Sequence, residues 1–211
     1  MSELEATMRL EELTAFQLAE AEGRKRDAKR HILAFVESFS DLDEKSVWVW
    51  ENWQDLHRNG ASRIRHELWE KLLLPVFHRA YLEGKLEAVV ALAECHHNWI
   101  SDPEFHSRFK VETDLDFWRL AYAMAPGDPR VRKGLLGTWL RVLDFIFHEW
   151  PSGLPGIDYS VWRQEVVELR SRIKRCRELD DAQKYHELFE YYEQILVEFA
   201  QRMGSSETDA S

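Results

Sequence analysis

Glycine and proline interrupt this chain almost only where an apolar pattern of helical spacing also ends. The 211 residues include 9 glycines and 6 prolines. Between these breaks, apolar residues recur at intervals of three and four, as Leu10, Leu13 and Phe16 do, which is the spacing of a helix face. Gly134 and Gly137 are exceptions because they fall inside a helical stretch. The pattern predicts an all-α fold of about eight to ten antiparallel helices, packed as helical hairpins or as a repeat-like bundle.

The breaks also predict where the helices lie. The stretch from Glu3 to about Ser38 forms two helices, or one helix that kinks near Gly23. The run Val47–Trp50 could be a short strand, but Trp53 and Leu56 continue the helical spacing and favour a helix. The remaining helices are expected at 44–58, 62–74 with a kink or restart at Pro75, 75–84, 85–97, 114–125, 129–149, 162–179 and 181–203.

The length of the chain is within the range of one domain. We expect a single helical domain over residues 1–203, with a possible sub-boundary in the loop 150–158, which is rich in proline and glycine. Residues 204–211 are small and polar without periodicity, and they are expected to form a disordered tail.

The composition bears on the cellular compartment. No apolar run approaches the ~20 residues of a membrane span, and the first ten residues do not resemble a secretory signal. Cys95 and Cys176 stand alone in the sequence, without a CxxC pair, so neither a disulfide framework nor a zinc knuckle is predicted. We therefore expect a cytoplasmic protein without a cofactor.

The charge of the chain points to the sign of its partner. With 28 basic and 38 acidic residues, the net charge is −10. A field of this sign repels phosphate backbones and attracts cations, so the expected partner is a basic protein rather than nucleic acid. Two basic clusters, Arg24–Arg30 and Arg170–Arg177, are flanked by acidic residues. The second cluster leaves RNA binding open as an alternative.

Two short segments resemble helical-repeat proteins of the tetratricopeptide kind. The segment Ala80–Ala88 has small and aromatic residues around Gly84, as in the turn between the two helices of such a repeat. The segment Tyr122–Pro129 resembles the passage to the next repeat. The resemblance implies antiparallel helix pairs that stack into a curved surface for a peptide or a protein. The two segments do not recur at the repeat's period of roughly 34 residues.

A metal site is the alternative that would make the chain an enzyme. Glu94 and His97 form one Glu-x-x-His pair, as in di-iron helical bundles, and Glu87 is seven residues before Glu94. Asp144 and His148, four residues apart, could supply a second half. The alternative reading of these residues is a solvated helix edge, in which charged side chains pair in water. The alternative function is then a di-iron or manganese enzyme.

The chain has nine tryptophans, and three of them are close together at positions 48, 50 and 53. Trp50 and Trp53 can share the inner face of a helix, but Trp48 is ~200° from Trp50 and projects from another side. Glu51 and Asp55 lie beside Trp48 at spacings of three and seven. An aromatic ring between two carboxylates suits a cationic ligand such as arginine.

We therefore expect the contact surface on residues 48–57, together with the neighbouring region Arg63–Trp69. The other interpretation of Trp48 is that it packs against another helix of the same chain. The predicted partner-binding residues are Trp48, Glu51, Asp55 and Trp69, and no catalytic residue is predicted.

Together these patterns predict a non-enzymatic protein-binding module whose acidic helical surface holds a basic protein. One form of this function is an immunity or antitoxin-like protein that neutralises a basic toxin. The metal-dependent enzyme and the RNA-binding protein are the alternatives. The sequence leaves the oligomeric state open.

Overall fold

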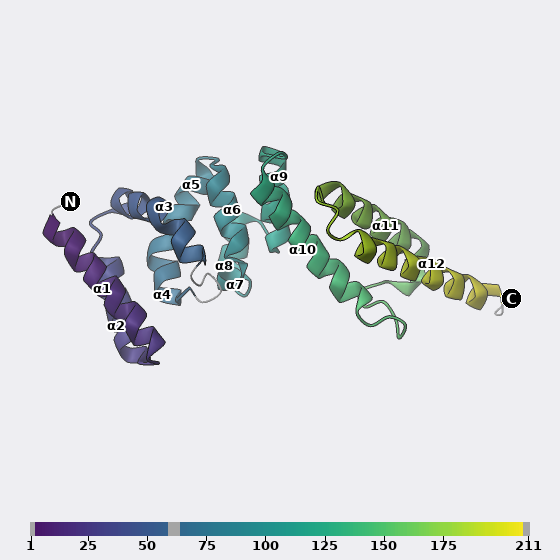
Figure 1. Cartoon of the computed structure of the whole chain (residues 1–211), viewed down its shortest axis with the longest axis horizontal. Helices are drawn as coiled ribbons and strands as arrows, with labels where there is room; N and C mark the ends of the chain where they lie inside the picture. The colour runs from purple at the N-terminus through teal and green to yellow at the C-terminus, as the bar shows by residue number, and fades with distance from the viewer. Residues whose placement is uncertain (1–2, 59–63, 209–211) are drawn as a thin grey trace. The chain divides into compact units, whose positions relative to one another are not determined.

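The computed structural model describes residues 3–58 and 64–208, and these residues form helices and no strand (Figure 1). The all-α prediction is confirmed. By contacts between Cα atoms the chain divides into two compact units, Met1–Phe117 and Trp118–Ser211. The division falls within a helix, whereas the sequence placed a possible sub-boundary at 150–158, inside the second unit. Each unit is described by itself below.

The first unit begins with a helical hairpin, α1 (Glu3–Ala21) and α2 (Lys25–Glu37). Gly23 joins the two helices with a φ of +71°, a left-handed conformation that a side chain would disfavour. The prediction of a break at this glycine is confirmed. The two helices lie antiparallel and side by side (Figure 1). The buried face of α2 consists of Ala28, Ile32, Phe35 and Val36.

Helix α3 (Leu42–Arg58) begins at a reciprocal cap. The Asp41 carboxylate accepts the backbone N–H of Glu44, and the Glu44 carboxylate accepts the backbone N–H of Ser40. Such a capping box satisfies donors that the first turn leaves unpaired. The segment Val47–Trp50 is helical, as favoured over a strand. Residues 59–63, where the sequence predicts the passage to the next helix, lie outside the described residues.

The next helical run has three parts: α4 (His66–Leu68), a π-helical turn (Trp69–Leu73) and α5 (Leu74–Leu82). The expected kink at Pro75 is therefore a widened turn just before the proline. Gly84 ends the run with a φ of +71°, as expected for a left-handed cap. The turn around Gly84, whose sequence resembles a tetratricopeptide turn, joins α5 to α6 (Leu86–Glu94).

An aromatic cluster closes the first unit. It is carried by α7 (His96–Trp99), α8 (Pro103–Phe109) and the first residues of α9 (Asp114–Met124). The rings of Trp99 and Phe105 stack with centroids 4.6 Å apart, and Phe105 and Phe109 stack at 4.2 Å. Helix α8 was not predicted, although Asp102 caps it and Pro103 is its first residue.

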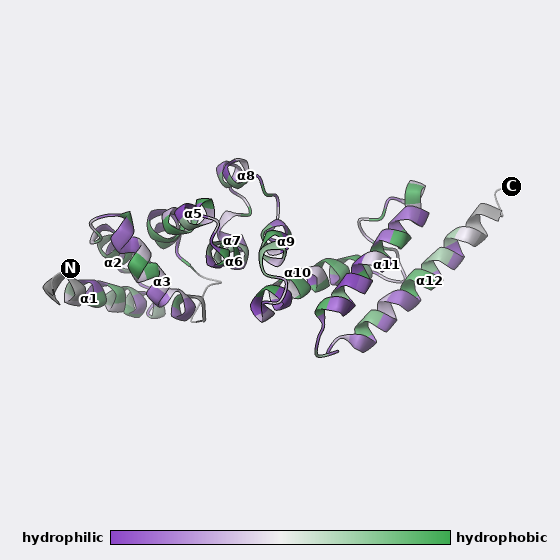
Figure 2. Ribbon diagram, turned by 90° about the horizontal axis from the view of Figure 1, so that it is seen from above, coloured by the Kyte–Doolittle hydropathy of each residue, from purple (hydrophilic) through white to green (hydrophobic). Residues whose placement is uncertain are grey.

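The second unit continues from α9 to α10 (Pro129–Phe147), which begins at residue 129 as predicted and which Asp128 caps. After the loop 150–158 and a 3-10 turn (Tyr159–Val161) come α11 (Trp162–Leu179) and α12 (His186–Thr208). Helices α11 and α12 lie side by side, each with hydrophobic turns between hydrophilic ones (Figure 2). Helix α11 ends at Leu179, which confirms the predicted break at 179–181. Just after it, the Asp180 carboxylate accepts the backbone N–H groups of Lys184 and Tyr185.

The last helix is longer than expected. Helix α12 extends to Thr208, whereas the sequence analysis ended it at 203 and assigned 204–211 to a tail. Over the described part of the chain, none of the helices combines the length and the apolar character that crossing a bilayer requires.

Candidate functional site

A groove runs between α1 and α3 in the first unit. It consists of two adjoining hollows of about 650 and 440 Å³, which share Leu13, Trp48 and Asn52 as lining residues. We call it the α1–α3 groove. The first hollow is lined by Arg9, Leu10, Leu13, Phe35, Ser40, Asp41, Asp43, Glu44, Val47, Trp48, Glu51 and Asn52. The second is lined by Leu13, Phe16, Gln17, Glu20, Ala21, Trp48, Asn52, Asp55, Leu56, Ile64, Arg65 and Leu68.

The groove exists because α1 uses only one side to pack on the rest of the unit. Ala19 is fully buried and Arg9 is 6% exposed on that side. Leu13 and Phe16 are only half-buried, and the Leu10 side chain is 66% exposed. Apolar area left in water at this spacing is available for a further contact. The sequence analysis placed Leu10, Leu13 and Phe16 on one helix face but did not predict this wall of the groove.

Trp48 lies at the middle of the groove, where both hollows meet. Its ring packs edge-on against Phe35 and Phe39, with centroids 4.9 and 5.9 Å away. The residue is nevertheless only half-buried, and the indole N–H has no partner among the described residues. Trp48 therefore both packs on α2 and offers a ring and a donor to a ligand.

The other two tryptophans of α3 lie on its inner side. Trp53 is 5% exposed and its ring centroid is 5.0 Å from that of Phe77. Trp50 packs on Phe77 as well, at 5.5 Å. Trp50 and Trp53 thus contact the same ring, whereas Trp48 contacts Phe35 of α2.

The lining of the groove carries more acid than base. Its carboxylates are Glu20, Asp41, Asp43, Glu44, Glu51 and Asp55, and its guanidinium groups are Arg9 and Arg65. Both guanidinium groups already pair with a lining carboxylate, Arg9 with Glu44 and Arg65 with Glu20. Asp43 pairs with Arg79.

Three carboxylates of the lining remain without an ion pair to any described residue: Asp41, Glu51 and Asp55. All three residues are exposed. Glu51 and Asp55 stand one turn apart on α3, because residues four apart share a helix face. Trp48 lines the groove beside them, as the sequence spacing predicted. The unpaired charge of the groove is therefore negative and lies along its apolar floor.

Arg9 fixes one end of α1 at the groove. Its guanidinium donates to the hydroxyl and the carbonyl oxygen of Ser38, at 3.0 and 2.7 Å, and lies 4.2 Å from the centre of the Phe39 ring. The ion pair to Glu44 is 2.7 Å long. The hydrogen bond from Arg9, helped by that from the Ser40 backbone, lowers the pKa of Glu44 to about 2. Arg9 and Glu44 neutralise each other's charge. We therefore assign this ion pair to holding α1 against α3 and not to binding a ligand.

Trp69 does not belong to the groove. It is 1% exposed and packs against Phe77 and Phe105, with centroids 6.3 Å away in both cases. A side chain buried to this extent cannot contact a partner, so its place in the predicted binding set was wrong. His57 and Arg63, which the predicted surface also included, lie outside the residues whose side chains the structure describes.

The candidate metal ligands are not assembled into a site. Helix α6 ends at Glu94, and Cys95 has non-helical backbone angles, φ −91° and ψ 17°, so His97 lies on a different helix, α7. Glu87 and His97 are exposed, as are Asp144 and His148 of the second unit. Across residues 3–58 and 64–208, no three His, Cys, Asp or Glu side chains are grouped to hold a metal ion.

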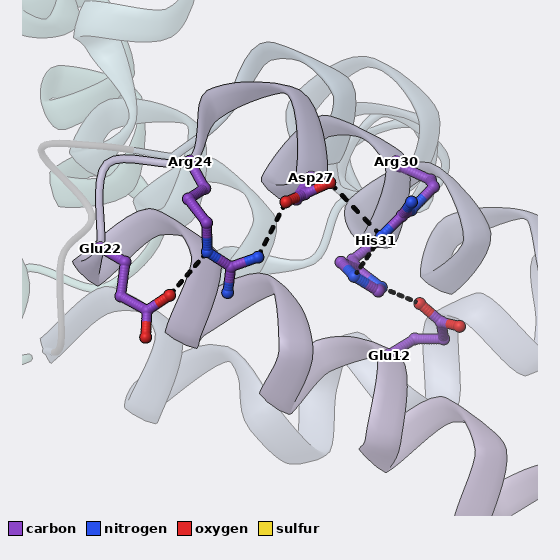
Figure 3. Close-up of polar contacts among 6 residues, drawn as sticks. All are labelled: Glu12, Glu22, Arg24, Asp27, Arg30 and His31. Atoms are coloured by element: carbon purple, nitrogen blue, oxygen red, sulfur yellow. Dashed lines mark hydrogen bonds and ion pairs between the residues drawn. The ribbon is translucent and has the colours of Figure 1, made fainter.

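Two arginines of the first basic cluster, Arg24 and Arg30, are engaged within unit 1 (Figure 3), whereas Lys25 and Arg26 are exposed. Arg24 donates to Glu22 and Asp27 at 2.6 and 2.8 Å, which lowers the pKa of the Asp27 carboxyl. Arg30 pairs with the other oxygen of Asp27 at 3.4 Å. Its guanidinium also lies 3.2 Å from Nε2 of His31, whose Nδ1 is 2.6 Å from Glu12. These cations neutralise local acids rather than form a basic surface.

The second basic cluster, on α11, is only partly engaged. Arg177 binds Glu190 and Glu193 of α12 at 2.6 and 2.8 Å, and Arg172 lies 3.8 Å from Glu168. Arg170, Lys174 and Arg175 are exposed. Glu168 and Glu178 flank the cluster in the sequence, and acidic side chains beside cations weaken a phosphate-binding field.

The two cysteines are buried and form no disulfide. Burial raises the pKa of both thiols, that of Cys176 to about 12. Neither thiol is poised as a nucleophile at neutral pH, because the thiolate is the reactive form.

Comparison with protein-family models, with curated proteins and with solved structures finds no match to this chain.

Proposed function

We propose that this chain is a protein-binding module that holds a basic partner in the α1–α3 groove. The observation that carries the proposal is the combination of half-buried Trp48 with the carboxylates of Glu51 and Asp55 beside it. Among the described side chains, neither the indole N–H nor these carboxylates have a polar side-chain partner. An aromatic ring next to carboxylates can bind arginine by stacking and by charge-assisted hydrogen bonds.

The apolar floor supplies the rest of the affinity. Interfaces gain most of their free energy from a few buried aromatic anchors, while charges at the rim direct the encounter. The net charge of −10 also attracts a basic partner, over a longer range than the charges of the groove. Occlusion of a basic toxin surface is one form that this function takes.

No observation favours either alternative as a second function. The ligands named for the metal enzyme are not grouped within the described residues. Of the cations named for RNA binding, Arg172 and Arg177 already pair with glutamates.

The test uses the Glu51→Lys, Asp55→Lys double variant, because both side chains are exposed and their replacement leaves the core intact. Tagged wild type and variant are purified from the same host, and the stoichiometry of co-purifying proteins is compared. The matched control is Asp144→Lys with Glu178→Lys, which makes the same change of charge at exposed carboxylates of the second unit.

We expect a basic protein to co-purify with wild type and with the control, to be lost from the groove variant and to be released by salt. A partner that the groove variant retains would contradict the proposal, and so would the absence of a partner from wild type. Thermal melts of all three proteins show that loss of binding is not loss of the fold.

A further inference from the structure

We infer that the occupant of the α1–α3 groove is a basic amphipathic α-helix of another protein, about three turns long. Its apolar side would lie on Trp48, and two of its cationic side chains, three or four residues apart, would face Glu51 and Asp55. This inference rests on the proposed function and specifies the form that the partner takes in the groove.

The walls of the groove have the pattern that receives a helix. The lining residues recur at intervals of three and four on both walls, at 10, 13, 17 and 20 on α1 and at 44, 47, 51 and 55 on α3, with their neighbours. Two such rows leave a channel between helix surfaces, and a third helix fills it by inserting its own i, i+3, i+4 and i+7 side chains.

An extended peptide suits the same walls poorly. Its backbone N–H and C=O groups need partners when they are buried, and the backbone groups of the walls are used within α1 and α3. Few lining side chains can donate to a peptide carbonyl, and the Asn52 amide already donates to the Trp48 carbonyl at 2.8 Å. A helix satisfies its own backbone and needs only side-chain contacts.

The charges of the groove define the polar side of the ligand. Glu51 and Asp55 are four residues apart on one wall, so cations spaced three or four residues apart on a facing helix can meet both. Asp41 lies in the first hollow and offers a third unpaired carboxylate. From Leu10 to Glu20 the α1 wall spans about 15 Å, at about 1.5 Å per residue, which sets a length of about three turns.

The occupant is not a described helix of a second copy of this chain. The basic helices α2, α10 and α11 already use their apolar faces within the fold, where Ile32 of α2, Leu135 of α10 and Ile173 of α11 are buried. A second copy could present these faces only by unfolding them. The partner is therefore a different protein with an unpaired basic helix.

Three labelled synthetic peptides of equal length test the inference by fluorescence anisotropy with the full chain. The first has leucines at i, i+3, i+4 and i+7, and two arginines four residues apart at other positions along the flank of this face. The second has the same residues except for two central prolines, which prevent a helix. The third has glutamates in place of the arginines.

We expect the first peptide to bind wild type about tenfold or more tightly than either of the others, and its affinity to fall about tenfold on the Glu51→Lys, Asp55→Lys variant. The Asp144→Lys, Glu178→Lys control should bind it as wild type does. Equal binding of the proline peptide, or no binding of the first peptide, would overturn the helical form of the ligand.

The failure of the inference can be told apart from that of the proposed function. If the groove variant loses the co-purified partner while the proline peptide binds wild type as well as the helical one does, the groove binds a basic protein in another form. If the groove variant keeps both the partner and the helical peptide, both proposals fail. A wild-type dimer that the groove variant abolishes would identify a second copy as the occupant and would overturn the inference.

Discussion

Lys45 of α3 donates a hydrogen bond of 2.9 Å from its ammonium group to the backbone carbonyl oxygen of Lys71. In an α-helix that carbonyl would accept the N–H of residue 75, which is a proline and has none. The π-helical turn Trp69–Leu73 lies where this bond is missing. A lysine from a neighbouring helix thus satisfies the acceptor that the proline leaves open.

This relationship predicts that Lys45 and Pro75 are coupled. Lys45→Met keeps the aliphatic stem but removes the donor, and it should lower the free energy of unfolding by about 1 kcal/mol. With Pro75→Ala as the background, residue 75 can donate to Lys71 itself, and the cost of Lys45→Met should fall close to zero. Urea unfolding of the four proteins measures the coupling. An equal cost in both backgrounds would show that the ammonium group does not act through this carbonyl.

The two glycines within α10 should respond in opposite ways to alanine. A Cβ on Gly134 would lie 2.2 to 2.5 Å from ring atoms of Trp118, which is 6% exposed, whereas a Cβ on Gly137 would meet nothing within 4 Å. Gly137→Ala should stabilise the protein by about 0.5 to 1 kcal/mol, because alanine restricts the unfolded chain and favours helix.

Gly134→Ala should instead destabilise the protein by about 1 to 3 kcal/mol through overpacking. Thermal and urea unfolding measure both variants under the same conditions. Stabilisation by both substitutions would mean that the Trp118 ring yields to the added methyl group at no cost.

The helical periodicity was enough to predict the fold class and most helix ends. Gly23, Gly84 and Asp128 end or begin helices where the sequence placed them, because these signals act over a few residues. Helix α8 was missed, although its Asp102 and Pro103 form the same start signal as Asp128 and Pro129. Its apolar residues are few, and a helix of seven residues shows little periodicity.

The site was predicted in part, for a physical reason. Trp48, Glu51 and Asp55 share one helix, so their common side follows from spacing alone. The opposite wall on α1 depends on which helix covers Leu10 and Leu13, and spacing within one helix does not contain that information. The burial of Trp69 could not be predicted either. A stripe of apolar residues has the same spacing whether it lies at the surface or in the core.

The ion pair between Arg9 and Glu44 should make stability depend on acid. The pKa of Glu44 lies at about 2 in the folded protein because of the hydrogen bond from Arg9, well below the ordinary value for glutamate of about 4.3. A lowered pKa contributes stability above the unfolded value, and this contribution is lost as the pH falls through 4 toward 2.

The matched variants are Glu44→Gln and Asp43→Asn. At pH 7, Glu44→Gln should cost about 1 to 2 kcal/mol after allowance for solvent screening, and the difference from wild type should shrink as the pH falls from 5 to 3. Asp43 pairs with Arg79 but its side chain is 87% exposed, so Asp43→Asn should cost under about 0.5 kcal/mol. Urea unfolding across this pH range checks both, and a cost of Glu44→Gln that does not change with pH would contradict the assignment.

His106 should stabilise the first unit more strongly while its ring is protonated. Its Nδ1 lies 2.8 Å from the carbonyl oxygen of Val111, and its Nε2 lies 3.0 Å from that of Ile100. A carbonyl oxygen only accepts, so both nitrogens can donate only when the imidazole carries two protons. The hydrogen bond to Ile100, followed by that to Val111, raises the pKa of His106. The stabilisation is therefore complete below the ordinary value of about 6.5 and is lost as the pH rises through the folded-state pKa.

His78 provides the contrast within the same unit, because burial, reinforced by the charge of Arg108, lowers its pKa. Titration of the ring Cε1–H signals by NMR, assigned with His106→Ala and His78→Ala, should place the pKa of His106 above the ordinary histidine value and that of His78 below it. The stability lost in His106→Ala should be larger at pH 6 than at pH 8.5, because wild-type His106 can keep only one of its two hydrogen bonds once it is neutral. A His106 signal that titrates at or below that of His78 would show that the two carbonyls do not hold an imidazolium.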